Sequence, residues 1–458
     1  MDVNGVKFWL GNNSGIVNTW VDTTAKNGYT YYYAVTSYDH GEVEIAPIEC
    51  SKYISVSPGG QIDLGTNVVI AKPEAPSAGY VPAGADSMIL QPGGTTTGMV
   101  HLNIINPGDV PENHLYRVTF EDTVSDHGST LLLLPMTKTI TLVDITNSDN
   151  PDTLINRDTT ISTGSQLPVV SGFQLILQNE AQLTANEETS AWNNTDIFNM
   201  LFTQYKYSRT YGIPLPADYR IDFGEVGFGH STEFMRGNAA LPAMDVNFKV
   251  TNLSQDKEIE FAFYERDGED GRFSADTSRN RKDQIIFLEM INDTLQPGWT
   301  FSVDISAGSY DSTSVNPNAG DYALVYLNKP FLSNDVFEFS TRGEFTDTEQ
   351  AKKDLDNIKV VPNPYIVTAS WEQENPYTTG RGPRELHFTH LPPKCTIRIF
   401  NVLGQLVATI EHNSDLWDGT GVWNMLTKDN LDVSYGVYVY HIDAEGIGEK
   451  IGKFAIIK

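Results

Sequence analysis

Alternating apolar and polar residues recur along most of this chain, and this pattern limits the fold more than any other feature of the sequence. Side chains at every second position of a strand share one face of a sheet, so each alternating run predicts a half-buried strand. The apolar positions of these runs are Val100, Leu102, Ile104, Tyr116, Val118, Phe120, Phe173, Leu175, Leu177, Tyr219, Ile221, Phe223, Val246, Phe248, Val250, Ile259, Phe261 and Phe263. One buried and one wet face is typical of antiparallel sheets.

Short clusters of turn-forming residues separate these runs, as at 106–109 (NPGD) and 147–151 (NSDNP). Repeated strands with such turns predict an all-β fold made of tandem antiparallel β-sandwiches. The chain has 458 residues, which is too long for one ordinary core, so we expect several domains. One short helix is expected at 194–205, where Ile197, Met200 and Leu201 share a face.

Composition suggests where the domains end. Residues 57–94 are rich in proline and glycine and predict an extended linker. We expect β-sandwich domains at 95–200 and 201–350, although the sequence leaves the break between them open within 180–215. A further domain is expected at 351–458.

The segment 27–39 (NGYTYYYAVTSYD) alternates around Tyr31, Tyr33 and Val35 and predicts a strand. It resembles the F strand and following loop of a fibronectin type III domain. Several strands precede this one in that family, and half a sandwich does not bury its inner faces. We therefore expect residues 1–56 to be the C-terminal part of such a domain, with its beginning and an export signal upstream. A self-contained β-hairpin is the alternative.

Four ordered motifs mark the C-terminal hundred residues: VVPNPY (360–365), IRIFNVLGQLV (397–407), WNMLTKDNLDVSYGVYVYHI (423–442) and GKFAIIK (452–458). They resemble the C-terminal sorting domain of type IX secretion cargo, and equally the immunoglobulin-like module related to the flagellar hook-capping protein. The first resemblance implies export through outer-membrane secretion machinery to the medium or outer surface of a Gram-negative bacterium. By position, the matching motif residues are Pro362, Asn363, Pro364, Gly404, Gly436, Tyr438, Lys453 and Lys458.

The hook-capping-like form is favoured by the pairs 423–424 (WN) and 429–430 (DN). A purely structural terminal sandwich is a third alternative, because a fold alone does not determine function. With either resemblance, the expected architecture is a tandem array of immunoglobulin-like and fibronectin type III-like sandwiches. Gly404 is expected to take a positive φ in a tight hairpin.

Charge and cysteine content exclude several classes of partner and scaffold. There are 59 acidic against 31 basic residues, a formal net charge of -28, and phosphate backbones repel such a chain. No apolar stretch approaches the roughly 18 residues that a membrane helix needs. The charge and the lack of a long apolar stretch lead us to expect no nucleic-acid partner and no membrane span. Cys50 and Cys395 fall in different expected domains, so we also expect no disulfide.

Catalytic motifs are missing from the sequence: there is no HExxH, GxSxG, CxxC or glycine-rich phosphate loop. The segment 229–233 (GHSTE) has Glu233 where a nucleophile motif needs glycine, so we interpret it as a loop. His387 and His390, three positions apart in an expected strand, point to opposite faces and do not suit one metal. We therefore expect no enzyme and no cofactor other than calcium.

Calcium is the one candidate ion, at a glycine-bent acidic segment formed by Asp267, Glu269, Asp270, Asp276 and Asp283. Five basic residues lie among these acids, and a salt-bridged surface loop is the favoured alternative. Trp192 and Trp299 have polar or turn-forming neighbours and are candidates for stacking on sugars, but burial in the core is the favoured interpretation because a large apolar side chain favours burial.

These expectations combine into a noncatalytic C-terminal region of a secreted or cell-surface multidomain protein. It would act as a stalk, an adhesin or a structural array, with stiff domains in series. Its expected partners are the outer-membrane secretion machinery and surface glycans or other surface proteins. The alternative is the accessory tail of a secreted peptidase or glycoside hydrolase, with carbohydrate-binding β-domains.

Overall fold

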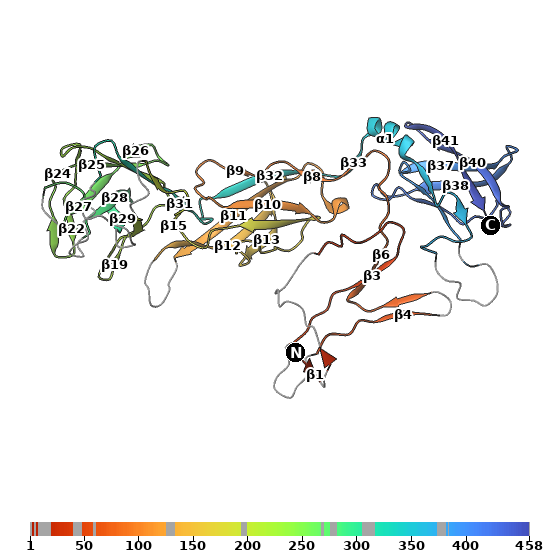
Figure 1. The fold of residues 1–458 in the computed structure, drawn as a ribbon, viewed down its shortest axis with the longest axis horizontal. Helices are drawn as coiled ribbons and strands as arrows, with labels where there is room; N and C mark the ends of the chain where they lie inside the picture. The colour runs from red at the N-terminus through yellow and green to blue at the C-terminus, as the bar shows by residue number, and fades with distance from the viewer. Residues whose placement is uncertain are drawn as a thin grey trace. The chain divides into compact units, whose positions relative to one another are not determined.

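The computed structural model describes residues 2–3, 6–7, 20–39, 48–57, 61–124, 133–193, 199–266, 270–274, 282–304, 317–372, 382 and 384–457. Strands dominate these residues, and α1 (Thr348–Asp354) is the α-helix among them (Figure 1). Nearly all strand pairs are antiparallel; β35 (Tyr365–Ile366) and β41 (Gly448–Ile457) pair in parallel. The predicted all-β, antiparallel fold class is confirmed.

The chain divides into two compact units that do not follow each other in sequence. Unit 1 comprises Met1–Gly84, Ile104–Glu112 and Arg342–Lys458, and unit 2 comprises Ala85–Asn103 and Asn113–Thr341. Each unit is described separately below.

The first sandwich of unit 2 packs a large sheet against a two-stranded one. The large sheet has the order β13 (Asp152–Asp158), β12 (Pro135–Asp144), β11 (Leu115–Val124), β32 (Val336–Arg342), β8 (Gly84–Ala85), with β9 (Ile89–Leu90) also on β32; the small one pairs β10 (Met99–Ile104) with β14 (Phe173–Gln178). Aromatic rings pack between the sheets: the ring centroids of Tyr116 and Phe339 lie 5.1 and 5.6 Å from that of Phe173.

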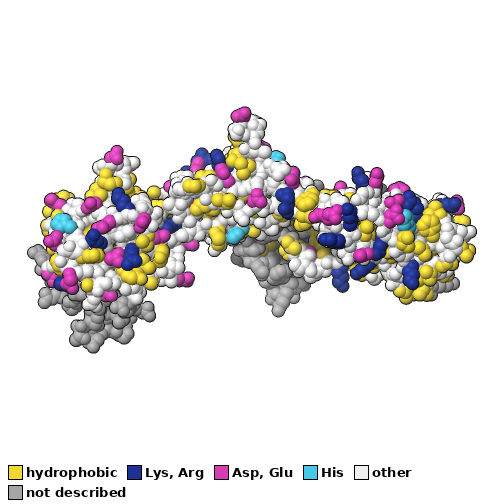
Figure 2. Space-filling view, turned by 90° about the horizontal axis from the view of Figure 1, so that it is seen from above, with side chains coloured by type: hydrophobic (Ala, Val, Ile, Leu, Met, Phe, Trp, Pro, Cys, Tyr) yellow, Lys and Arg dark blue, Asp and Glu magenta, His cyan; other side chains and the backbone are white. Residues whose placement is uncertain are grey.

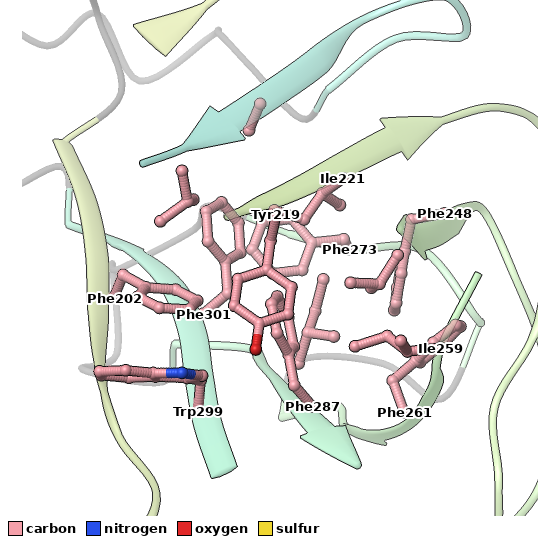
Figure 3. Close-up of a cluster of buried hydrophobic side chains, with 14 of the residues drawn as sticks. Phe202, Tyr219, Ile221, Phe248, Ile259, Phe261, Phe273, Phe287, Trp299 and Phe301 are labelled. Carbon is pink, nitrogen blue, oxygen red and sulfur yellow. The ribbon is translucent and has the colours of Figure 1, made fainter. Parts of the chain in front are cut away.

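A second sandwich, the inserted sandwich, spans residues 183–328 between β14 and β32. One sheet has the order β16 (Ala191–Trp192), β30 (Tyr322–Val325), β20 (Tyr219–Phe223), β25 (Phe248–Asn252), β26 (Lys257–Glu258); the other has the order β17 (Asn199–Gln204), β29 (Thr294–Asp304), β28 (Gln284–Ile291), β27 (Glu260–Tyr264). The strand β20 supplies the predicted alternation, with Tyr219, Ile221 and Phe223 buried. Figure 3 shows the aromatic core between the sheets.

The first sandwich is therefore discontinuous, and its last strand arrives after the whole inserted sandwich. Residues Leu115–Thr119 of β11 pair with Val336–Ser340 of β32. The expected succession of domains at 95–200 and 201–350 does not describe this arrangement. Alternation within a strand contains no information about which strand it joins.

The C-terminal sandwich of unit 1 also has two sheets. One has the order β34 (Lys359–Val361), β36 (Leu386–Thr389), β39 (Gly421–Trp423), and the other the order β35, β41, β40 (Gly436–Ala444), β37 (Lys394–Asn401), β38 (Leu406–Asn413). Its core includes Phe388, Ile397, Tyr440 and Phe454. Cys395 is buried here and Cys50 is exposed, and both are free thiols, as predicted.

The expected linker at 57–94 is instead packed structure. It contains β5 (Ile62–Leu64), β6 (Val68–Ala71), β7 (Tyr80–Val81), β8 and β9. Residues 75–81, which we call the strap, lie along the C-terminal sandwich: Ser77 N donates to Leu416 O at 3.1 Å and Ala78 N to Leu391 O at 3.0 Å. The prolines keep this backbone extended, as predicted, but its small residues let it pack, so Ala75 and Ala78 are buried.

One further expectation, the helix at 194–205, differs from the structure, and another, the strand at 27–39, is present without the expected sandwich core. The helix expected at 194–205 is wrong where the structure describes it, since Asn199–Gln204 is β17, paired with β29; pairing within the sandwich overrides local helix propensity. The predicted strand at 27–39 is present as β3 (Tyr31–Ala34), which pairs with β6. Its neighbours Trp20 and Val35 are 73% and 81% exposed, so the described part of this segment has no sandwich core.

Candidate functional site

The predicted sorting-motif residues that the structure describes gather at one end of the C-terminal sandwich, where β37 and β41 end and β40 begins. Asn363, between Pro362 and Pro364, contacts the last strand: its Oδ1 accepts a bond from Ala455 N at 3.2 Å, and its Nδ2 donates to the Lys453 carbonyl at 3.4 Å. The opening motif is thus attached to the closing motif through one asparagine side chain.

The other motif residues complete this end. Gly436 and Tyr438 pair with Ile456 and Phe454, and the Tyr438 ring stacks on Phe454 at 5.6 Å. Tyr438 donates its hydroxyl to the Ser434 carbonyl at 2.6 Å, and burial raises its pKa. Lys453 is exposed on β41, and Lys458 lies outside the described residues.

Gly404 sits in the β37–β38 turn with a φ of 76°, which confirms the predicted tight hairpin. The Asn401 side chain closes the turn, because its Oδ1 accepts bonds from Leu403 N and Gln405 N at 3.0 Å each. Val402 and Leu403 at the tip are 71% and 79% exposed. An apolar tip therefore projects from the same end as the motif residues.

A cavity of about 350 Å³ opens beside this end. Its walls include Val367, Tyr435 and Ile457, with Arg384 and Asp432 as its charged residues. Val367 has a φ of 60°, which is strained for a β-branched side chain. The walls of this cavity thus combine apolar and charged side chains, and they contain no cysteine, serine or histidine.

The proposed calcium ligands are only partly described. Asp267, Glu269 and Asp276 lie outside the described residues. Buried Asp283 accepts backbone bonds from Arg266 N and Ser274 N, both at 2.8 Å, and Asp270 accepts one from Arg272 N at 2.9 Å. Within the described residues, no group of three or more His, Cys, Asp or Glu side chains is arranged to hold a metal. The calcium site remains a prediction.

The segment 229–233, interpreted from the sequence as a loop, is a loop only at residues 231–233. Gly229–His230 forms β21, and the buried Ser231 Oγ accepts a bond from Met244 N at 3.0 Å. His230 lies 3.0 Å from Asp245 on the surface. His387 is buried against Trp371 and lies 3.2 Å from Glu385, whereas His390 contacts Thr389.

Both candidate sugar-stacking tryptophans contribute to the core of the inserted sandwich. Trp299 is 2% exposed and donates to Leu215 O at 3.0 Å. Trp192 stacks on Phe223 at 5.5 Å. The favoured interpretation, burial in the core, is confirmed for Trp299, and the sugar-stacking candidate does not hold there because turn-forming neighbours in sequence do not imply that a side chain is exposed.

Sequence reasoning missed a group of aromatic and basic residues on the inserted sandwich. Arg236 lies between the rings of Tyr207 and Tyr264, from three different strands. No local motif marks these residues, because they are up to 57 positions apart in the chain (207 to 264). On the face seen in Figure 2, acidic and basic side chains are interspersed with hydrophobic ones.

Comparisons with known proteins give weak similarities. No protein family and no curated protein matches the sequence. One similar solved structure is PorZ, described as an essential surface component of the type IX secretion system of Porphyromonas gingivalis: 12% identity, a TM-score of 0.19, and coverage of 74% of this chain and 44% of PorZ. Another is the BSP domain of a biofilm-associated protein, with 11% identity, a TM-score of 0.14 and 83% coverage of each chain.

At these TM-scores, neither similarity identifies a function for this chain, which spans less than half the length of PorZ. Among the helices that the structure describes, none has the length and hydropathy to cross a membrane.

Proposed function

We propose that this chain is a noncatalytic display region of a secreted, cell-surface protein of a Gram-negative bacterium. In this proposal, the C-terminal sandwich is recognised by outer-membrane secretion machinery and anchors the chain, and unit 2 is the module that is presented to the surroundings. The gathering of the sorting-motif residues at one end of the C-terminal sandwich supports the first part.

One observation supports the second part: unit 2 is inserted into unit 1. The strap strand β7 pairs with β33 (Phe345–Thr346), with Tyr80 opposite Thr346 and Val81 opposite Phe345. Apart from residues 104–112, the residues from 85 to 341 between these paired strands belong to unit 2. One ladder of unit 1 thus brackets most of unit 2 in the sequence, with residues 104–112 returning to unit 1 in between, and this supports unit 2 as the presented module.

A secreted peptidase or glycoside hydrolase with this chain as its accessory tail is the alternative. In this alternative the C-terminal sandwich is the same anchor, but the whole protein carries a catalytic domain in addition to this chain. Calcium binding at the 267–283 loop and contacts with surface glycans are compatible with both proposals.

The test is secretion of the natural full-length protein from its own host. Asn363→Ala removes both side-chain bonds between the opening motif and β41. We expect the unchanged protein at the surface or in the medium and the variant retained in the cell, while the matched surface change Asn106→Ala, which removes a 2.6 Å bond to Asp109, leaves export unchanged. Unchanged protein confined to the cytoplasm would contradict the proposal.

A further inference from the structure

Two hairpins cover the outer face of the β17–β29–β28–β27 sheet in the inserted sandwich. They are β18 (Lys206–Tyr207) with β19 (Thr210–Tyr211), and β22 (Phe234–Arg236) with β23 (Ala239–Leu241). Tyr205, Phe234 and Leu241 pack on Ile286 and the apolar residues around it. The hairpins approach each other closely, since a Cβ on Gly237 would lie 2.1 Å from the Tyr207 ring.

Arginines and tyrosines alternate where these hairpins meet the sheet, and we call Tyr207, Arg236, Tyr264, Arg266 and Gln284 the Tyr/Arg cluster. The Arg236 Cζ lies 5.0 Å from the Tyr207 ring centroid and 4.2 Å from that of Tyr264, and the Arg266 Cζ lies 5.5 Å from the latter. Ring contact holds the face of a guanidinium and leaves its edge N–H donors available. The cluster therefore presents oriented donors.

Hydrogen-bond acceptors are scarce in the Tyr/Arg cluster. The Arg236 guanidinium interacts with the Tyr205 side chain, and its Nη2 donates to the neutral Gln284 Oε1 at 3.3 Å. Arg236 Nε is buried without a partner among the described residues. No described carboxylate forms an ion pair with Arg236 or Arg266. The adjacent Glu265 instead accepts backbone bonds from Asp270 N at 2.7 Å and Gly271 N at 3.3 Å.

The surroundings extend this donor surface. Lys206 lies 5.3 Å from the Tyr211 ring centroid, and Lys206 and Arg209 are both exposed at the β18–β19 hairpin. Met235, at 57%, is the mostly exposed large hydrophobic residue in these two hairpins. One such side chain does not form the wider apolar centre that is typical of protein–protein interfaces.

We propose that the Tyr/Arg cluster binds an acidic polysaccharide through its carboxylate or sulfate groups. Such a ligand supplies acceptors for the accessible N–H groups of the guanidiniums, those of the exposed Arg266 first, and a planar carboxylate takes two parallel N–H bonds from one guanidinium. The inference goes beyond the proposed function and does not depend on secretion, because it concerns one face of the inserted sandwich.

The test measures binding of the purified full chain to polygalacturonate and dextran sulfate by calorimetry, with neutral dextran as the uncharged probe. The double variant Arg236→Gln/Arg266→Gln is expected to lose at least about tenfold in affinity, and Arg236→Lys to lose part of it although the charge is kept. The matched control is Arg117→Gln, an exposed arginine of the first sandwich paired with Glu338 at 2.7 Å, and its affinity is expected to stay the same.

Thermal unfolding of each variant checks that it folds, and the exposed Arg266→Gln alone tests the proposal where Arg236 variants do not fold. Binding that weakens as salt rises supports the proposal. Three results overturn it: no binding to either acidic polysaccharide, an equal loss in Arg117→Gln, or tighter binding to poly-glutamate, which would indicate an acidic protein partner instead.

Discussion

Lys329 is a buried charge at the point where the chain leaves the inserted sandwich. Its Nζ lies 2.7 Å from Asp218 Oδ2, with side-chain exposures of 7% and 23%. The other Asp218 oxygen accepts a bond from Leu327 N at 3.0 Å. The pair therefore connects the end of the inserted sandwich to the start of β20.

Lys329→Ala leaves Asp218 with a desolvated charge and no cation. We expect it to lower the free energy of unfolding of unit 2 by about 2–3 kcal/mol, measured by urea titration. Lys249→Ala is the matched control, since its pair with Glu258 at 3.2 Å is 35% and 56% exposed, and we expect a loss below about 1 kcal/mol. Equal losses would show that the Lys329 pair does not depend on burial.

His412 makes the stability of the C-terminal sandwich depend on pH. Its ring is 8% exposed and lies 3.0 Å from Ser414 Oγ, and burial holds its pKa below the ordinary value. The unfolded chain therefore binds a proton more readily than the folded one. The stability from this group is complete above pH about 6.5 and is lost as pH falls below it.

We expect the melting temperature of this sandwich to drop between pH 7.5 and 5.5, and His412→Gln to reduce that drop. Calorimetry at both pH values measures this. His390→Gln is the control, because His390 is only partly buried, beside Thr389. An undiminished drop in the His412 variant would assign the effect to other groups.

Individual side chains were predictable from the sequence when local geometry decides their role. Gly404 illustrates this, because a glycine in a tight turn between two predicted strands favours a positive φ. Lys329, Arg236 and Trp299 were not, since their surroundings come from strands far apart in the chain. The sequence also identified the motif residues of the C-terminal sandwich, but not the contact of Asn363 with β41.

At the scale of elements, the strap depends on one glycine. Gly79 has a φ of 75°, and a Cβ there would lie 2.4 Å from Asp347 O and 2.6 Å from the Ala351 Cβ. Gly79 N donates to Asp354 Oδ2 at 3.0 Å, and its carbonyl accepts from Asp347 N at 2.8 Å. The strap is thereby fixed to α1, whose N-cap is Asp347.

Gly79→Ala should therefore destabilise unit 1 by about 2–4 kcal/mol, from backbone strain and overpacking together. Gly404→Ala is a close control: its φ of 76° is nearly the same, but nothing lies within 4 Å of the added Cβ. We expect about 1–2 kcal/mol for that control. Thermal unfolding compares them, and equal effects would mean that the strap does not pack as described.

Strands were predictable as elements, because alternation is a local property, as in β20 and β25. Pairing partners were not predictable: β32 joins β11, and β7 joins β33, across long stretches of chain. The proline-rich segment also shows that an extended backbone predicted from composition can be a packed element. Its small buried residues, Ala75, Ser77 and Ala78, are the signal that sequence reasoning passed over.

The whole molecule is nested, which replaces the expected arrangement of domains in series. The inserted sandwich interrupts the first sandwich, and unit 2 interrupts unit 1 between β7 and β33. A force applied to the two ends of the chain passes from the strap directly to the C-terminal sandwich. We therefore expect unit 2 to bear little of this force until the strap separates.

Single-molecule pulling through handles at the two chain ends tests this claim most directly. The account predicts that roughly 850–900 Å of extension from residues 86–340 appears only after a strap rupture, at about 3.3–3.6 Å per residue. Gly79→Ala should lower that rupture force. A disulfide between Val81→Cys and Phe345→Cys, in a Cys50→Ser background, joins the two ends of the intervening segment, so it should remove this extension and assign it to that segment. Extension of unit 2 before strap rupture, at a force unaffected by Gly79→Ala, would contradict the nested arrangement.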